Sequence, residues 1–75
     1  MPSYQDKIGL VGSITSGNNA GYSVRIENDA KQTGGFLILG WSQDRLNAFD
    51  YWVEKMADLE GFFDESGWEV EWPSH

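Results

Sequence analysis

Residues 36–41 place the strongest constraint on the fold. They contain the longest uninterrupted apolar run of the chain, Phe36 to Leu39, and continue with Gly40 and Trp41. Because successive residues of a strand point to opposite faces of a sheet, a strand of this composition is apolar on both faces. We therefore expect it to be the central strand of a sheet, with a helix covering one face and long or aromatic side chains covering part of the other.

Two segments that precede this strand predict a β-hairpin. Residues 7–15 alternate between two faces and predict a first strand. Tyr22, Val24 and Ile26 alternate with polar residues and predict a second strand with a polar outer face. Residues 16–21 between them are rich in glycine and asparagine, which tolerate the backbone conformations of tight turns. The two strands are therefore expected to pair with each other.

The segment that follows the apolar strand permits two interpretations. Apolar residues recur there at spacings of three and four, which predicts a helix over 43–65 with Ser42 as its N-cap. The same segment also alternates over 49–54, so these residues form an extra strand in the competing interpretation. The helix then covers only about 57–66 and is capped by Asp58. We prefer the longer helix, whose apolar stripe consists of Leu46, Phe49, Trp52, Met56, Leu59 and Phe63.

A final strand is predicted at 68–72, where apolar residues alternate with Glu69 and Glu71 before Pro73 ends the strand. The order β-β-β-α-β predicts an α+β fold in which one mainly antiparallel sheet packs on a single helix. The length is that of a single domain spanning 1–75. The pattern leaves open whether the last strand pairs parallel inside the sheet or antiparallel at its edge. The predicted core includes Val24, Ile26, Phe36, Ile38, Phe49, Leu59, Phe63, Trp68 and Val70.

The net charge of the chain lies entirely in its second half. Residues 1–40 carry three acidic and three basic residues and are neutral. Residues 41–75 carry nine acidic residues and two basic ones, which gives the net charge of −7. Such segregation is typical of a protein that binds a basic partner, because unmixed charge costs stability through self-repulsion. The nine acidic residues are Asp44, Asp50, Glu54, Asp58, Glu60, Asp64, Glu65, Glu69 and Glu71.

The residue types needed for catalysis are scarce. The chain has no cysteine, and its one histidine, His75, is the last residue. We therefore expect no catalytic residue, no metal site and no cofactor, and we expect that the protein is not an enzyme. Glu69 and Glu71 share one face of a strand, but so short a chain has little room for the cleft that a glycosidase requires. The acidic residues between 58 and 65 lack the pattern of a calcium-binding loop.

The composition also limits the compartment and the kinds of partner. Net −7 disfavours direct binding to nucleic acid or to anionic membranes, because both repel acidic proteins. The N-terminal residues lack a basic stretch followed by an apolar run, so no signal peptide is predicted. We expect a soluble, cytoplasmic protein whose partner is another protein. The oligomeric state is not determined by the sequence.

Four stretches resemble a known family. They are GGFLIL at 34–39, FDYWVE at 49–54, DLEGFF at 58–63 and WEVEW at 68–72. In apolar spacing and acidity they resemble the small acidic immunity proteins that are encoded beside the toxins of bacterial polymorphic toxin systems. The resemblance implies a cytoplasmic protein that binds one cognate toxin domain and blocks its active site. It transfers no individual residue role, because interface residues vary among such proteins.

The charge pattern and the resemblance lead to one binding hypothesis. An acidic face formed by the helix and the last strand contacts a basic toxin domain, and a tryptophan anchors the contact. Two other interpretations remain: a phage-type anti-defence inhibitor that mimics nucleic-acid charge, and a small acidic subunit that docks on a basic protein. The predicted partner-binding residues are Trp52, Asp58, Glu60, Asp64, Glu65, Glu69, Glu71 and Trp72.

Overall fold

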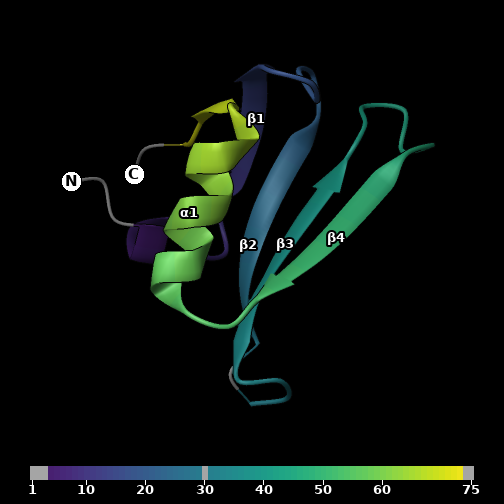
Figure 1. The fold of residues 1–75 in the computed structure, drawn as a ribbon. Coiled ribbons are helices and arrows are strands. Elements are labelled where there is room, and N and C mark those ends of the chain that lie inside the picture. Colours follow the sequence, from purple (N-terminus) through teal and green to yellow (C-terminus); the bar gives the residue numbers. More distant parts are fainter. Residues whose placement is uncertain (1–3, 30, 74–75) are drawn as a thin grey trace.

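The alternating segments of the chain form five antiparallel strands, and one α-helix packs on one face of the sheet (Figure 1). This arrangement is given by a computed structural model, which describes residues 4–29 and 31–73. Within this part of the chain it confirms the predicted α+β fold with one antiparallel sheet and a single α-helix. The elements in chain order are the 3-10 helix η1 (Tyr4–Lys7), β1 (Val11–Ser16), β2 (Ser23–Asp29), β3 (Gly35–Trp41), β4 (Ala48–Val53), α1 (Met56–Ser66) and β5 (Glu69–Glu71).

The strands lie in the order β4-β3-β2-β1-β5, and every neighbouring pair is antiparallel. Consecutive hairpins connect β1 to β2, β2 to β3 and β3 to β4. After α1 the chain returns to pair β5 with β1 at the opposite edge, which settles the pairing that the sequence left open. The strand that we expected at the centre, β3, is an interior strand, but β2 holds the middle position.

The core lies between one face of the sheet and α1. Its buried side chains are Ile14, Val24, Ile26, Ile38, Leu59 and Phe63. Full burial of one such side chain is worth roughly 1.5–3 kcal/mol, so this small set supplies a large share of the stability. Of the other predicted core residues, Phe36, Trp68 and Val70 are partly buried against this set, and Phe49 is half-buried. The predicted core omitted Ile14, which is almost completely buried.

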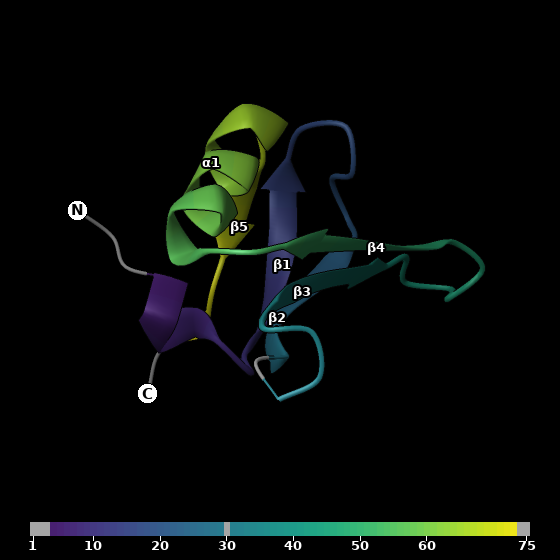
Figure 2. The same cartoon turned by 60° about the horizontal axis from the view of Figure 1, so that its bottom comes forward.

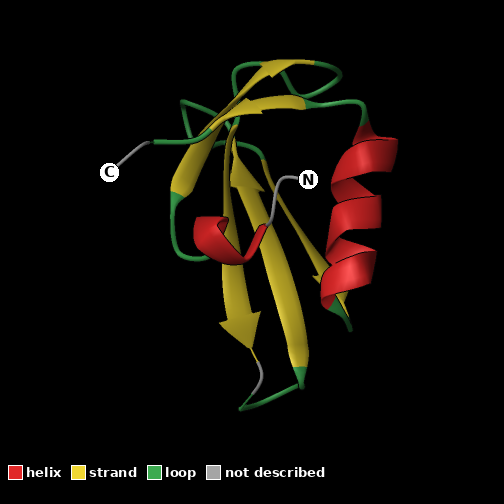
Figure 3. Ribbon diagram, turned by 90° about the vertical axis from the view of Figure 1, so that its left-hand side faces the viewer, coloured by secondary structure: helices red, strands yellow, loops and turns green. Residues whose placement is uncertain are grey.

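The second face of the sheet carries no helix, as Figures 2 and 3 show from two further sides. We call this side, opposite α1, the open face. The far end of the β3–β4 hairpin extends beyond the helix (Figures 1 and 2). The open face therefore exposes one side of β3, which the sequence predicted to be apolar on both faces.

The preferred prediction of a helix over 43–65 is wrong, and the competing interpretation is right. Residues 48–53 form β4, which pairs with β3 without interruption from Phe36 opposite Val53 to Trp41 opposite Ala48. Leu46, the first residue of the predicted apolar stripe, does not lie in the core, because it is 82% exposed in the β3–β4 turn. Cross-strand hydrogen bonds and the partial burial of Phe49 and Val53 outweigh a local period that fits both structures.

Ser42 does not cap a helix, although we predicted that role. It is buried at the β3–β4 turn, where its hydroxyl donates to Asp44 Oδ1 at 2.6 Å and accepts from the Asn47 amide at 3.1 Å. The Leu46 amide donates to the same Asp44 oxygen at 3.0 Å. These two hydrogen bonds, that from Ser42 first, hold the pKa of Asp44 below its usual value. The serine that suggested a helix start therefore stabilises a turn instead, together with Asp44.

The N-terminus of α1 is stabilised by the side chain of Asp58, the third residue of the helix. Lys55 is the N-cap, and its backbone amide donates to Asp58 Oδ2 at 3.3 Å. This is the backward half of a capping box, in which an acidic side chain accepts from the N-cap amide. Asp58 thus fulfils the capping role that the competing interpretation gave it, although from inside the helix.

The N-terminal segment is shorter as a strand than we predicted. The first strand was expected at 7–15, but β1 begins at Val11, because residues 4–7 form η1 and a turn follows in which Gly9 has a φ of 86° and the Leu10 amide donates to the Lys7 carbonyl. The ring of Tyr4 stacks on that of Phe63 with centroids 4.8 Å apart, so η1 covers part of α1. A stacked aromatic pair contributes about 0.5–1.5 kcal/mol beyond its buried area.

Two leucines from the predicted helical stripe test the observed fold. Leu59→Ala is expected to lower the free energy of unfolding by about 2–5 kcal/mol, because Leu59 is completely buried. Leu46→Ala is the matched control and is expected to change it by less than about 0.5 kcal/mol. Denaturant titration of both variants measures the difference. Equal losses from the two substitutions would support the helix over 43–65 and contradict the strand β4.

Candidate protein-binding surfaces

The described residues offer no metal centre. None of their His, Cys, Asp and Glu side chains form a group of three or more that is suited to hold a metal ion. The single histidine, His75, lies outside the described residues. The helix that the structure describes is too short and too polar to cross a bilayer. The remaining candidate sites are hollows and exposed surfaces.

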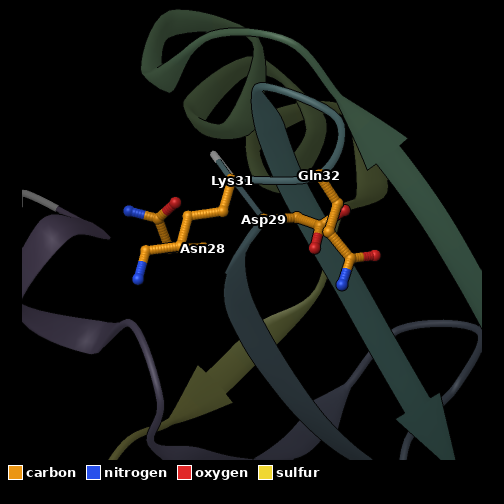
Figure 4. Close-up of a pocket in the computed structure, with 4 residues that line it drawn as sticks. All are labelled: Asn28, Asp29, Lys31 and Gln32. Atoms are coloured by element: carbon orange, nitrogen blue, oxygen red, sulfur yellow. The ribbon is translucent and has the colours of Figure 1, made fainter.

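One hollow lies at the turn between β2 and β3 and has a volume of about 410 Å³. Figure 4 shows Asn28 and Lys31 extending to one side of it, and Asp29 and Gln32 to the other. The lining combines one carboxylate, one amine and two amides. These groups include no nucleophile with an adjacent base, which a catalytic site would require. Asp29 is better explained by the turn, since three successive amides donate to its backbone carbonyl.

The acidic surface of α1 is the first candidate for partner binding. Four of its carboxylates, all predicted partner-binding residues, are exposed, and the helix contains no lysine or arginine. The one ion pair among the described residues joins Arg25 to Glu27, and both of these residues belong to β2 and not to α1. None of the helix carboxylates therefore forms an ion pair with a described basic side chain. They are those of Asp58, Glu60, Asp64 and Glu65.

Two of these carboxylates act together on a neighbouring tyrosine. Burial raises the pKa of Tyr4, and the negative charges of Glu60 and Asp64 raise it further. Glu60 and Asp64 are four residues apart and therefore lie on one side of the helix. The tyrosine thus reports the negative potential of this surface.

Glu69 and Glu71 are also exposed, but they belong to a different surface. Val70 between them packs against the core, so its two neighbours on β5 point to the open face. The structure therefore divides the predicted acidic face. The carboxylates of α1 lie on one side of the sheet, and those of β5 lie on the other.

Trp52 is exposed yet held in one position. It was expected in the core stripe and also as an anchor, and 47% of its surface is accessible on the open face. Its indole Nε1 donates to Thr33 Oγ1 at 2.8 Å, and that hydroxyl donates to Asp29 Oδ2 at 2.8 Å. The ring lies against Gly35, where an added Cβ would come within 2.7 Å of it. A large side chain fixed before binding loses little entropy when a partner covers it.

Trp72, the alternative anchor, is built into the core side of the sheet. Its ring packs against that of Phe63, with the two centroids 6.1 Å apart. It also lies directly over Gly12, where an added Cβ would come within 2.7 Å of the Trp72 ring. Trp68 likewise contacts the rings of Phe49, Phe62 and Phe63. These two tryptophans are therefore structural, and Trp52 is the better anchor.

Trp41 was not among the predicted partner-binding residues, although it contributes to the open face. It lies on the open face of β3 beside Leu37 and Leu39, and all three are only partly buried. Arg45 from the turn lies over the Trp41 ring at 6.0 Å, a cation–π contact. A shallow hollow of about 490 Å³ runs along this part of the sheet, and Arg25 also lines it. The signal was present in residues 36–41, since a strand apolar on both faces needs cover on both.

Known proteins provide no relative with which to compare these surfaces. No family model matches the chain, and searches of curated proteins and of solved structures find no significant match. The candidate surfaces are therefore ranked on their geometry and charge alone.

The hydrogen bond that holds Trp52 can be tested directly. Thr33→Ala is expected to speed hydrogen exchange at the Trp52 indole N–H roughly two- to tenfold, because such a bond is worth about 0.5–1.5 kcal/mol. Thr33→Ser keeps the hydroxyl and is expected to exchange like the parent chain. Two-dimensional NMR of the indole N–H signal measures the rates. If exchange in Thr33→Ala is unchanged, the hydroxyl does not hold the ring.

The potential of the α1 surface can be measured through Tyr4. Replacing Glu60 and Asp64 by glutamine and asparagine is expected to lower the pKa of Tyr4, with burial keeping part of the elevation. Because the folded chain holds this proton more tightly than the unfolded chain, stability falls as the pH rises past 10.0 toward the folded pKa. NMR titration of the Tyr4 ring measures the shift, and Tyr4→Phe should remove this part of the pH dependence. An unchanged Tyr4 titration in the double variant would contradict the assigned potential.

Proposed function

We propose that this protein is a non-catalytic inhibitor of the immunity type, which binds a basic toxin domain and blocks its active site. The observation that carries the proposal is the set of exposed carboxylates on α1, none of which forms an ion pair with a basic side chain in the described part of the chain. Repulsion among them lowers the stability of the free domain. A basic partner would relieve that repulsion on binding, so the exposed carboxylates would favour the complex over the free domain.

Two surface features contribute to different steps of binding, one to association and the other to dissociation. The negative charge, net −7, attracts a basic domain over distances of about 8–10 Å at moderate ionic strength and so speeds encounter. An exposed tryptophan held in place, here Trp52, slows dissociation by burying a large area at little entropic cost. Toxin domains that cleave or modify phosphate-bearing substrates commonly have basic clefts, which an acidic domain of this size is suited to fill.

The experiment begins with capture of the partner from the native host and continues with binding kinetics of the purified pair. In the variant Glu60→Gln with Asp64→Asn, and separately in Glu69→Gln with Glu71→Gln, association at low salt is expected to slow by up to about tenfold. Both variants lose the same charge, so a larger effect of one identifies the surface nearer the partner. Trp52→Ala is the contrasting variant and is expected to speed dissociation without changing the salt dependence.

The choice of a neutral-half control follows from the structure. Glu27 forms an ion pair with Arg25, and Asp29 accepts a hydrogen bond from Thr33, which in turn holds Trp52. Substituting either residue would therefore disturb the structure as well as the charge. Asp6 in η1 is exposed, and Asp6→Asn measures the effect of losing a single carboxylate outside α1 and β5. The proposal fails if the captured partner is not basic, or if binding leaves its activity unaffected. It also fails if neither double variant slows association at low salt.

A further inference from the structure

The two edges of the sheet differ in how well they are protected against pairing with another strand. Edge strands normally carry features that block such pairing, among them short length, bulges, charges and prolines. β5 has the first three, being three residues long with an irregular register against Ile14 and Ser16 and the carboxylates of Glu69 and Glu71, and Pro73 follows two residues after its end. This edge is closed to a further strand.

β4, at the other edge, has almost none of these features. It has six residues without proline, its register against β3 is continuous, and Asp50 is its one charged residue. Its remaining residues are an alanine, a valine and three aromatic residues. Among the elements drawn in Figures 1 and 2, none lies along the outer edge of β4. A long apolar edge of this kind is suited to accept a strand.

The register identifies the backbone groups that this edge presents. The Ser42 amide donates to the Asn47 carbonyl at 2.9 Å, and this pair continues the register of β3 and β4. Hydrogen-bonded pairs alternate along an antiparallel ladder, so Phe49, Tyr51 and Val53 bond to β3. The amides and carbonyls of Asp50 and Trp52 therefore point outward, and no described residue bonds to them.

The side chains beside this edge define the chemistry of an incoming strand. Asp50 and Trp52 lie on the open face, where a lysine or arginine of the incoming strand would meet a carboxylate and an indole ring. On the other face, Phe49 and Tyr51 belong to an aromatic cluster with Phe62, and Tyr51 is 51% exposed. Apolar side chains of the incoming strand would extend this cluster. The edge thus fits a strand that is basic on one face and apolar on the other.

We propose that β4 binds an extended segment of the partner, which adds to the sheet as a sixth strand with its basic side chains on the open face. This inference deepens the proposed function, on which it rests, by naming the contact that the partner makes. A second copy of this chain suits the edge less well, because self-pairing would bring two chains of net −7 together. The carboxylates of α1 and β5 then act at a distance, while β4 makes the contact.

The probe is a synthetic eight-residue peptide of alternating lysine and valine, added to the full chain. Amide hydrogen exchange at Asp50 and Trp52 is expected to slow by about tenfold when the free peptide is at ten times its Kd. Exchange at Phe49 and Tyr51 is expected to be slow already without peptide, because their amides bond to β3. A peptide of alternating glutamate and valine is the matched control and should give no protection.

A pair of variants separates backbone pairing from charge. Asp50→Pro removes the outward amide and is expected to weaken peptide binding at least tenfold beyond the effect of Asp50→Ala, which removes the carboxylate alone. The exchange measurement on the parent chain stands even if Asp50→Pro does not fold. The proposal is overturned if a millimolar concentration of the lysine–valine peptide protects neither Asp50 nor Trp52. It is equally overturned if the two amides become protected by self-association without peptide.

The outcomes distinguish this inference from the proposed function. A captured basic partner that binds while the Asp50 and Trp52 amides still exchange rapidly would disprove strand addition and leave the inhibitor proposal standing. Protection by the peptide, together with a partner that is not basic or is not inhibited, would do the reverse.

Discussion

The pairing of β4 with β3 is the interaction on which the rest of the structure depends. It makes β3 an interior strand, and it brings the chain to the position from which α1 can cross the sheet. Two glycines of β3 permit close packing: a side chain at Gly40 would collide with the Phe49 ring, and one at Gly35 would collide with Trp52. The aromatic residues of β4 thus cover β3 on both faces, Phe49 on the side of α1 and Trp52 on the open face.

The same pairing separates charge from apolar contact surface. Had residues 43–65 been one helix, Trp52 would lie in the core and the acidic residues would form one outer surface. With β4 in place, Trp52 is exposed on the open face, and the carboxylates of α1 and β5 lie on opposite sides of the sheet. The separation is compatible with binding because charge acts over about a Debye length, whereas an anchor acts only on contact. Steering and anchoring therefore do not need to occupy the same surface.

The sequence predicted the strands with alternating residues well and the segment after them poorly. The hairpin of β1 and β2 and the last strand followed from alternation, and β3 followed from its uninterrupted apolar run, each to within a few residues. Over 49–54 the apolar residues satisfy both a helical and a strand period, so local pattern could not choose between them. The choice depends on cross-strand hydrogen bonds to residues 36–41, which are distant contacts that a local pattern does not contain.

By itself, the sequence determined that the chain forms an α+β domain, that residues 36–41 lie inside a sheet, and that the acidic residues of its second half are exposed. These properties depend on composition and local periodicity, which act residue by residue. Only the tertiary structure decided which tryptophan is exposed, which carboxylates share a surface and which sheet edge is unprotected. Each of these depends on the order of the strands and on the face that each side chain meets, and a sheet sets both by pairing segments that are far apart in the chain.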